Sequence, residues 1–103
     1  MKKIILIVFG AGSMSGIVLA ASAAKGKETF GQCGVCHSAD TDDRKFGPSL
    51  KGLFKHAKLA NDKEVNEKNV RAKINEGGKG MPVYAEMLSD AEKDNLIAYL
   101  KTL

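Results

Sequence analysis

The sequence has little that would stabilise a small protein on its own. Among 103 residues there are only two cysteines. They lie three positions apart, and a disulfide between them would close too short a loop to stabilise the fold much. There is no internal repeat, and no run of alternating apolar and polar residues is long enough to predict a sheet. These absences favour a single all-α domain.

Neither basic nor acidic residues dominate the chain. The sequence has 16 lysines and arginines against 12 aspartates and glutamates, a formal net charge of +4. Two of the positive charges, Lys2 and Lys3, lie at the very start of the chain. No basic stripe interleaved with aromatic residues is present, so we expect no nucleic-acid partner.

The first 23 residues resemble a secretory leader. The positive start is followed by the apolar run Ile4–Phe9, and a second apolar run, Ile17–Ala20, follows a glycine- and serine-rich middle. Ala21-Ser22-Ala23 is an A-x-A cleavage signal. We therefore expect residues 1–23 to be a cleaved signal peptide and residues 24–103 to form the domain, exported to the periplasm.

Two alternatives to this cleavage remain open. Residues 4–21 are close to the shortest apolar length that spans a bilayer, so an uncleaved leader would anchor the protein to a membrane. Processing after Ala24 is a further option. With either cut, the exported chain is so short that its apolar core is marginal and needs a disulfide, a metal or a large buried cofactor.

Three segments are predicted to be helices, with one further short helical turn. The first covers Lys25 to about Cys33. The second begins after Asn66, a plausible N-cap, and ends at Gly77-Gly78. The third begins at Ser89, which forms a capping box with Glu92. Residues 53–59 are predicted to form the short helical turn.

The last predicted helix carries the clearest apolar stripe, with a period near 3.6 residues. The stripe consists of Leu96, Ile97, Tyr99, Leu100 and Leu103. We expect it to pack against the face of the first helix that carries Phe30. The remaining long loops are expected to pack on something other than protein.

One motif carries chemistry, the C-x-x-C-H sequence from Cys33 to His37. This spacing is typical of covalent haem attachment: each thiol of Cys33 and Cys36 reaches one vinyl arm of the porphyrin, and His37 becomes an axial ligand of the iron. A redox-active C-x-x-C would require a βαβ context that is absent here. A zinc site would have to recruit His56, at a spacing that fits no common pattern. A plain disulfide leaves the small core unexplained.

The second axial position of the iron has three candidates. Met81 lies in a glycine-rich loop that ends in Pro82, which allows close approach to a porphyrin and leaves few apolar partners for its side chain. Met87 is interpreted as core packing beneath the last helix, and His56 as a surface residue. We therefore predict His37 and Met81 as the two ligands of one haem c per chain. A thioether ligand raises the reduction potential of the iron.

The order of these motifs resembles the class I cytochromes c of the short, soluble bacterial type. The residues that carry the resemblance are Gly26, Phe30, the motif from Cys33 to His37, Gly47-Pro48-Ser49-Leu50-x-Gly52, Gly80-Met81-Pro82 and Ile97-Ala98-Tyr99-Leu100. The resemblance implies the cytochrome c fold, with three to four helices and long loops around one haem. It also implies that the first and last helices cross near Gly26, Phe30 and Tyr99.

The resemblance also implies a supporting role for Pro48. In the family this proline's carbonyl accepts a hydrogen bond from the proximal histidine, here His37, which fixes the histidine's tautomer. The sequence departs from the family in having no tryptophan to bond a haem propionate. Four residues are candidates for the propionates: Arg44, Lys45, Asn61 and Tyr84.

The function expected from these residues is single-electron transfer without catalysis. Partners would be redox proteins met in brief complexes by a monomer, and contact with a membrane would come only through partners or an uncleaved leader. Lys51, Lys73 and Lys79 are candidates for steering an acidic partner. Two alternatives stay open: a haem enzyme or sensor with an open sixth site, and a non-catalytic cytochrome subunit of a larger oxidoreductase.

Overall fold

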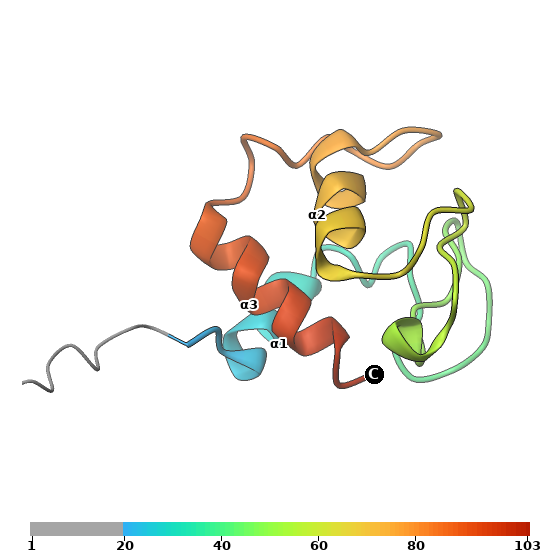
Figure 1. The fold of residues 1–103 in the computed structure, drawn as a ribbon, viewed down its shortest axis with the longest axis horizontal. Coiled ribbons are helices and arrows are strands. Elements are labelled where there is room, and N and C mark those ends of the chain that lie inside the picture. Colours follow the sequence, from blue (N-terminus) through green and yellow to red (C-terminus); the bar gives the residue numbers. More distant parts are fainter. Residues whose placement is uncertain (1–19) are drawn as a thin grey trace, which may run out of the picture.

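The computed structural model describes residues 20–103 and shows an all-α domain (Figure 1). Its elements are α1 (Ala23–Phe30), the 3-10 helix η3 (Leu53–Lys55), α2 (Glu67–Glu76) and α3 (Asp90–Leu100). In this described part there is no strand, only two isolated bridges. The fold class predicted from the sequence is thus confirmed. Most of the predicted leader, residues 1–19, lies outside the described part.

Helix α1 is placed differently from its prediction. It begins at Ala23, two residues before the expected start, because the Ser22 side chain caps it. It ends at Phe30 rather than near Cys33. The Phe30 carbonyl accepts hydrogen bonds from the N–H groups of both Cys33 and Gly34, at 2.7 and 2.8 Å, so the chain continues as tight turns instead of regular helix. The cysteine motif therefore lies on turns that follow α1.

Helices α1 and α3 pack directly against each other (Figure 1). Gly26 is buried at the crossing, and a Cβ at this position would lie only 1.9 Å from the carbonyl oxygen of Asn95. One turn further along, the rings of Phe30 and Tyr99 meet with centroids 5.3 Å apart and tilted by 58°. The expected crossing near Gly26, Phe30 and Tyr99 is confirmed. It depends on glycine because only a residue without a side chain allows this approach.

The predicted capping box at the start of α3 is present in both directions. The Ser89 hydroxyl accepts from the Glu92 N–H at 3.1 Å, and the Glu92 carboxylate accepts from the Ser89 N–H at 2.8 Å. The stripe that follows is largely buried, although Tyr99 and Leu103 are only half-buried. The apolar core consists of Phe30, Leu53, Val70, Ile74, Tyr84, Leu88, Leu96, Ile97 and Leu100.

Helix α2 is bounded as the sequence predicts. The Asn66 side chain accepts from the Asn69 N–H at 2.8 Å, and Gly77 follows the last turn with a positive φ of 60°. The chain then folds back, since the Tyr84 N–H donates to the Ile74 carbonyl at 3.1 Å. The loop that contains Met81 is thereby fixed against α2.

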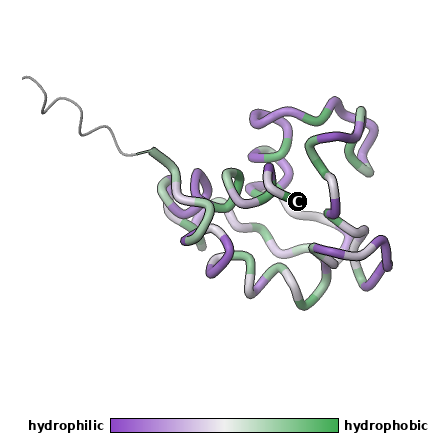
Figure 2. The backbone as a smooth tube through the Cα atoms, turned by 90° about the horizontal axis from the view of Figure 1, so that it is seen from below, coloured by the Kyte–Doolittle hydropathy of each residue, from purple (hydrophilic) through white to green (hydrophobic). Residues whose placement is uncertain are grey.

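The loops between α1 and α2, drawn in green, lie at one end of the domain and the α1–α3 pair at the other, while the loop between α2 and α3 runs along the top (Figure 1). Figure 2 shows the domain from below, with extended hydrophilic stretches along the loops. Within residues 20–103, none of the helices has the length and hydropathy needed to cross a membrane.

Candidate functional site

A cavity of about 890 Å³ opens between α2 and the long loops. Its lining includes the four residues that the sequence singles out for the cofactor: Cys33, Cys36, His37 and Met81. Apolar core residues such as Leu53 and Ile74 form other parts of its wall. The volume falls within the range of about 300–1,000 Å³ typical of pockets for small molecules and cofactors. The structure therefore brings the candidate residues together around one space.

The imidazole of His37 is held from behind by the Gly47-Pro48 segment. Its Nδ1 lies 2.7 Å from the Pro48 carbonyl oxygen, an acceptor, so Nδ1 carries the proton and donates. The other nitrogen, Nε2, is left as a neutral ligand atom. The Gly47 N–H in turn donates to the Cys36 carbonyl at 2.8 Å. The position expected for Pro48 is therefore the one observed.

Gly47 has a steric role that the sequence did not reveal. A Cβ on this residue would lie 2.5 Å from Cε1 and 2.9 Å from Nδ1 of His37. Any other amino acid would have to displace the imidazole or the loop, since real Cβ contacts are not this short. In the sequence, the adjacent Pro48 indicates only that Gly47 lies in a loop, and nothing local indicates that Gly47 contacts the His37 ring.

Both cysteines are free thiols and half-buried. Burial raises the pKa of Cys33, and the neighbouring Cys36 adds to the rise. In the part of the chain that the structure describes, no group of three or more histidine, cysteine or acidic residues is placed to hold a metal ion. The zinc alternative therefore finds no support.

Met81 is presented by a tight glycine turn. Gly78 and Met81 exchange two backbone hydrogen bonds, at 2.9 and 3.1 Å. A Cβ at Gly77 would lie 2.4 Å from the Pro82 carbonyl oxygen, so this position excludes any larger residue. The Lys73 ammonium donates to the Gly77 carbonyl at 2.9 Å and ties the turn to α2. The half-buried Met81 side chain is thus held at the wall of the cavity.

The two rival ligands have different environments. The interpretation of Met87 as core packing is wrong: its side chain is 62% exposed, and the buried residues near it in the chain are Tyr84 and Leu88. It does not line the cavity. His56 is exposed, as expected, but it does line the cavity, with Nε2 at 3.3 Å from the Lys51 carbonyl oxygen.

The charged residues of the cavity wall are all basic. Its lining contains no aspartate or glutamate, and its cationic side chains are Arg44, Lys58, Lys73 and Lys79. Of the four propionate candidates, Arg44, Asn61 and Tyr84 line the cavity. Lys45 does not, because its ammonium donates to the Gly34 carbonyl at 2.8 Å. Lys58 and His56 were missed as propionate candidates, since nothing in the sequence indicates that their loop folds over the cavity.

Phe46 is a second residue that sequence reasoning missed. Its side chain is 83% exposed, yet it lines the cavity. Its ring edge also lies 4.0 Å from the Cβ position of Gly80, in the turn that presents Met81. Phe46 thus connects the histidine side of the cavity with the methionine side.

Comparison with known proteins identifies a family and solved structures with a similar fold. The cytochrome c family model matches residues 23–103. A search of curated protein sequences found no match. Among solved structures, cytochrome c6 from the diatom Phaeodactylum tricornutum is similar, with a TM-score of 0.64 and 22% identity over 80% of this chain and 93% of the diatom chain. At this identity the likeness shows a shared fold.

The residues that line the cavity fit a covalently bound haem. Two thiols that can attach the porphyrin and one oriented imidazole are the groups that covalent haem attachment uses, and a thioether is one of the second ligands that haem iron accepts. A basic wall without carboxylates suits its anionic propionates. Together with the family match, these residues show that the cofactor is haem c and that the protein carries electrons. The chain belongs to the cytochrome c family and is a class I c-type cytochrome.

Proposed function

We propose that this protein is a periplasmic carrier of single electrons whose haem c is ligated by His37 and Met81. When bound, the haem iron supplies a one-electron redox change. The observation that carries the proposal is the hydrogen bond between His37 Nδ1 and the Pro48 carbonyl, at 2.7 Å, beside a cavity that Met81 also lines. This bond orients the imidazole and directs Nε2 away from Pro48.

The surrounding residues act by holding this arrangement fixed. The Gly47 backbone lies against the imidazole on one side, and the bonded turn of Gly78 and Met81 restricts the thioether on the other. Rigid ligands favour outer-sphere transfer, since little has to move when the charge changes. If His37 and Met81 both bind the iron, no position on it would remain for a substrate. This argues for a carrier rather than an enzyme or sensor.

The ligand set can be tested with two methionine variants. The ferric protein is expected to show the sulfur-to-iron absorption band at the red edge of the visible spectrum. Met81→Ala is expected to abolish the band and to allow carbon monoxide to bind the ferrous form. Met87→Ala is the matched control and should leave the band unchanged, because Met87 is exposed and outside the cavity. A band that survives in Met81→Ala, or is lost in Met87→Ala, would exclude this ligand set.

We propose further that redox partners dock on an exposed apolar surface beside the cavity. We call it the rim surface and define it by Val35, Phe46 and Val83, which are 76%, 83% and 57% exposed. Val35 lies in the cysteine motif, and Phe46 precedes Gly47, which contacts the His37 ring. Val83 lies in the loop that contains Met81. Two contacts join these segments, the Lys45 ammonium on the Gly34 carbonyl and the Phe46 ring near Gly80.

The charge around this surface favours an acidic partner. Lys45 and Lys79 flank the rim surface, and the cavity wall behind it contains no carboxylate. A small apolar contact with basic neighbours suits a monomer that forms brief complexes, since electrostatic attraction speeds association more than it strengthens binding.

Stopped-flow electron transfer with an acidic redox protein tests this docking. The association rate should fall as salt is added. Lys79→Glu should lower the rate at low salt on the order of tenfold. Lys27→Glu, on the exposed face of α1, is the control and should have a much smaller effect. A flat salt response, or equal effects of the two variants, would contradict the proposal.

A further inference from the structure

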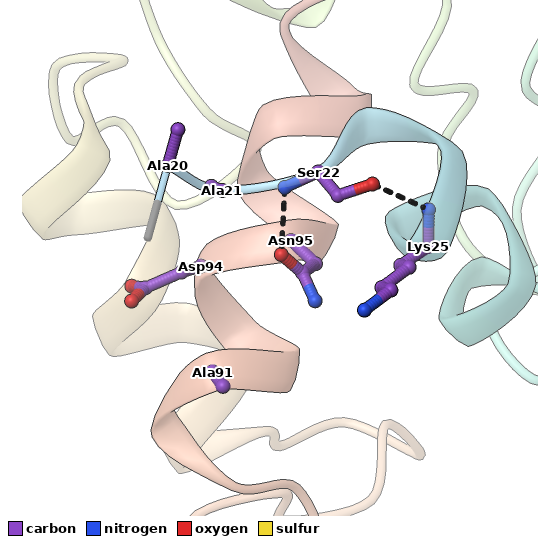
Figure 3. Close-up of a pocket in the computed structure, with 7 residues that line it drawn as sticks. All are labelled: Ala20, Ala21, Ser22, Lys25, Ala91, Asp94 and Asn95. Carbon is purple, nitrogen blue, oxygen red and sulfur yellow. Dashed lines mark hydrogen bonds between the residues drawn. The ribbon is translucent and has the colours of Figure 1, made fainter. Parts of the chain in front are cut away.

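Ser22, which immediately precedes α1, is held by three hydrogen bonds. Its hydroxyl accepts from the Lys25 N–H at 3.1 Å, and its carbonyl accepts from the Gly26 N–H at 2.9 Å. Its own N–H donates to Asn95 Oδ1 on α3, at 2.7 Å (Figure 3). The first two bonds satisfy N–H groups at the start of α1, and the third joins α1 to α3.

Asn95 is placed for this contact by the helix crossing itself. Its carbonyl oxygen is the atom that Gly26 approaches, so its side chain extends beside the start of α1. Figure 3 shows Ser22 lying over α3, with Ala20 and Ala21 continuing past Asp94. A hollow of about 370 Å³ lies between these residues and Ala91 of α3. Ser22 is therefore part of the packed domain.

We propose that the leader is cut on the N-terminal side of Ser22, at the Ala20–Ala21 or the Ala21–Ser22 bond, so that the exported domain keeps Ser22. The inference rests on the proposed function only in requiring that the chain is exported. A leader peptidase would hydrolyse the bond with one water, leaving a carboxylate on the leader and an amine on the domain. Both bonds follow an alanine, the small residue that ends such a signal, although the residue two positions before that alanine is Val18 or Leu19 rather than a second alanine.

The competing cut is the one that the A-x-A signal predicts, after Ala23. It would remove Ser22 together with its three hydrogen bonds. The N–H groups of Lys25 and Gly26 would lose their acceptors, and Asn95 Oδ1 would lose its donor. The new ammonium of Ala24 would also lie at the positive end of the shortened helix, where the helix dipole disfavours a cation.

The intact mass of the exported holoprotein tests the position of the cut. The expected chain begins at Ala21 or Ser22. A chain that begins at Ala24 or Lys25, or one that retains Met1, would overturn the inference. The absorption spectrum of the same sample tests the proposed function separately: a haem-loaded protein that begins at Ala24 overturns the inference alone.

Unfolding of the exported Ser22→Ala variant gives a second, independent result. The substitution keeps a small residue on the domain side of both proposed bonds, so processing should continue, and the mass verifies this. If Ser22 remains in the domain, loss of its cap should raise the equilibrium constant for unfolding in urea about fivefold. Lys27→Ala, on the exposed face of α1, should have little effect. Equal stability of Ser22→Ala and the wild type would overturn the inference.

Discussion

The two ends of this domain are stabilised in different ways. At one end α1 and α3 bury each other's apolar faces, with Gly26 against the Asn95 backbone and Phe30 against Tyr99. At the other end, long loops surround a cavity of about 890 Å³, and their backbone is held mainly by turns and single hydrogen bonds. The helix pair carries its own core, whereas the loop end encloses a cofactor.

This difference indicates where the cofactor contributes to folding. A chain of this size has a marginal apolar core, and binding of a large apolar group adds buried surface. That addition falls on the loop end, where the wall residues Leu53 and Ile74 meet the cavity. The helix pair should therefore depend less on the haem than the loops do.

The largest effect is expected from the double variant Cys33→Ser and Cys36→Ser, which removes both attachment points. The exported protein should lack covalent haem, shown by absence of its colour in denaturant. Hydrogen exchange followed by mass spectrometry should find the loop segment 37–65 exchanging much faster than in the holoprotein, with α1 and α3 losing less protection. Equal loss of protection at both ends would contradict the proposal that the loops depend on the haem more than the helix pair does.

Gly26→Ala tests the end that has its own core. Its Cβ would lie 1.9 Å from the Asn95 carbonyl oxygen and 2.8 Å from Tyr99 Cβ, so the two helices must move apart. We expect the holoprotein to lose about 3 kcal/mol in its free energy of unfolding, measured by urea titration. Lys27→Ala, exposed on the same helix, is the control and should change it by less than about 0.5 kcal/mol.

Gly47→Ala tests the loop end with the haem in place. Its Cβ would approach His37 Cε1 to 2.5 Å and would push the imidazole away from its position. We expect a loss of about 1–3 kcal/mol in unfolding free energy, together with a changed visible spectrum. Gly34→Ala is the control, since its Cβ would meet only ordinary contacts, at 3.5 Å or more. An unchanged spectrum in Gly47→Ala would show that the ring is not held by this contact.

The smallest effect is expected from Ser89→Ala, which removes half of the capping box of α3. The Glu92 N–H would lose its acceptor, at a cost of about 1 kcal/mol in unfolding free energy. The visible spectrum should not change, because the cap lies outside the cavity. A spectral change would mean that the two ends of the domain are more tightly coupled than their packing indicates.

The sequence by itself determined the local chemistry of this protein. The capping residues Ser89 and Asn66 marked helix starts, and the spacing of Cys33, Cys36 and His37 indicated the cofactor, because these signals depend on near neighbours in the chain. The exposed position of Met87 and the earlier start of α1 were not predicted. The start of α1 is set by the Ser22 cap, whereas the exposure of Met87 depends on how the chain packs, which the local pattern does not contain.

Only the tertiary structure decided which residues surround the cofactor. It placed Gly47 against the His37 ring, Phe46 beside Gly80, and Lys58 rather than Lys45 on the cavity wall. It also joined Ser22 to Asn95, 73 positions apart in the chain. Such pairings arise when the helices cross and the loops close, so they depend on the packing of the whole domain rather than on the preference of any one segment.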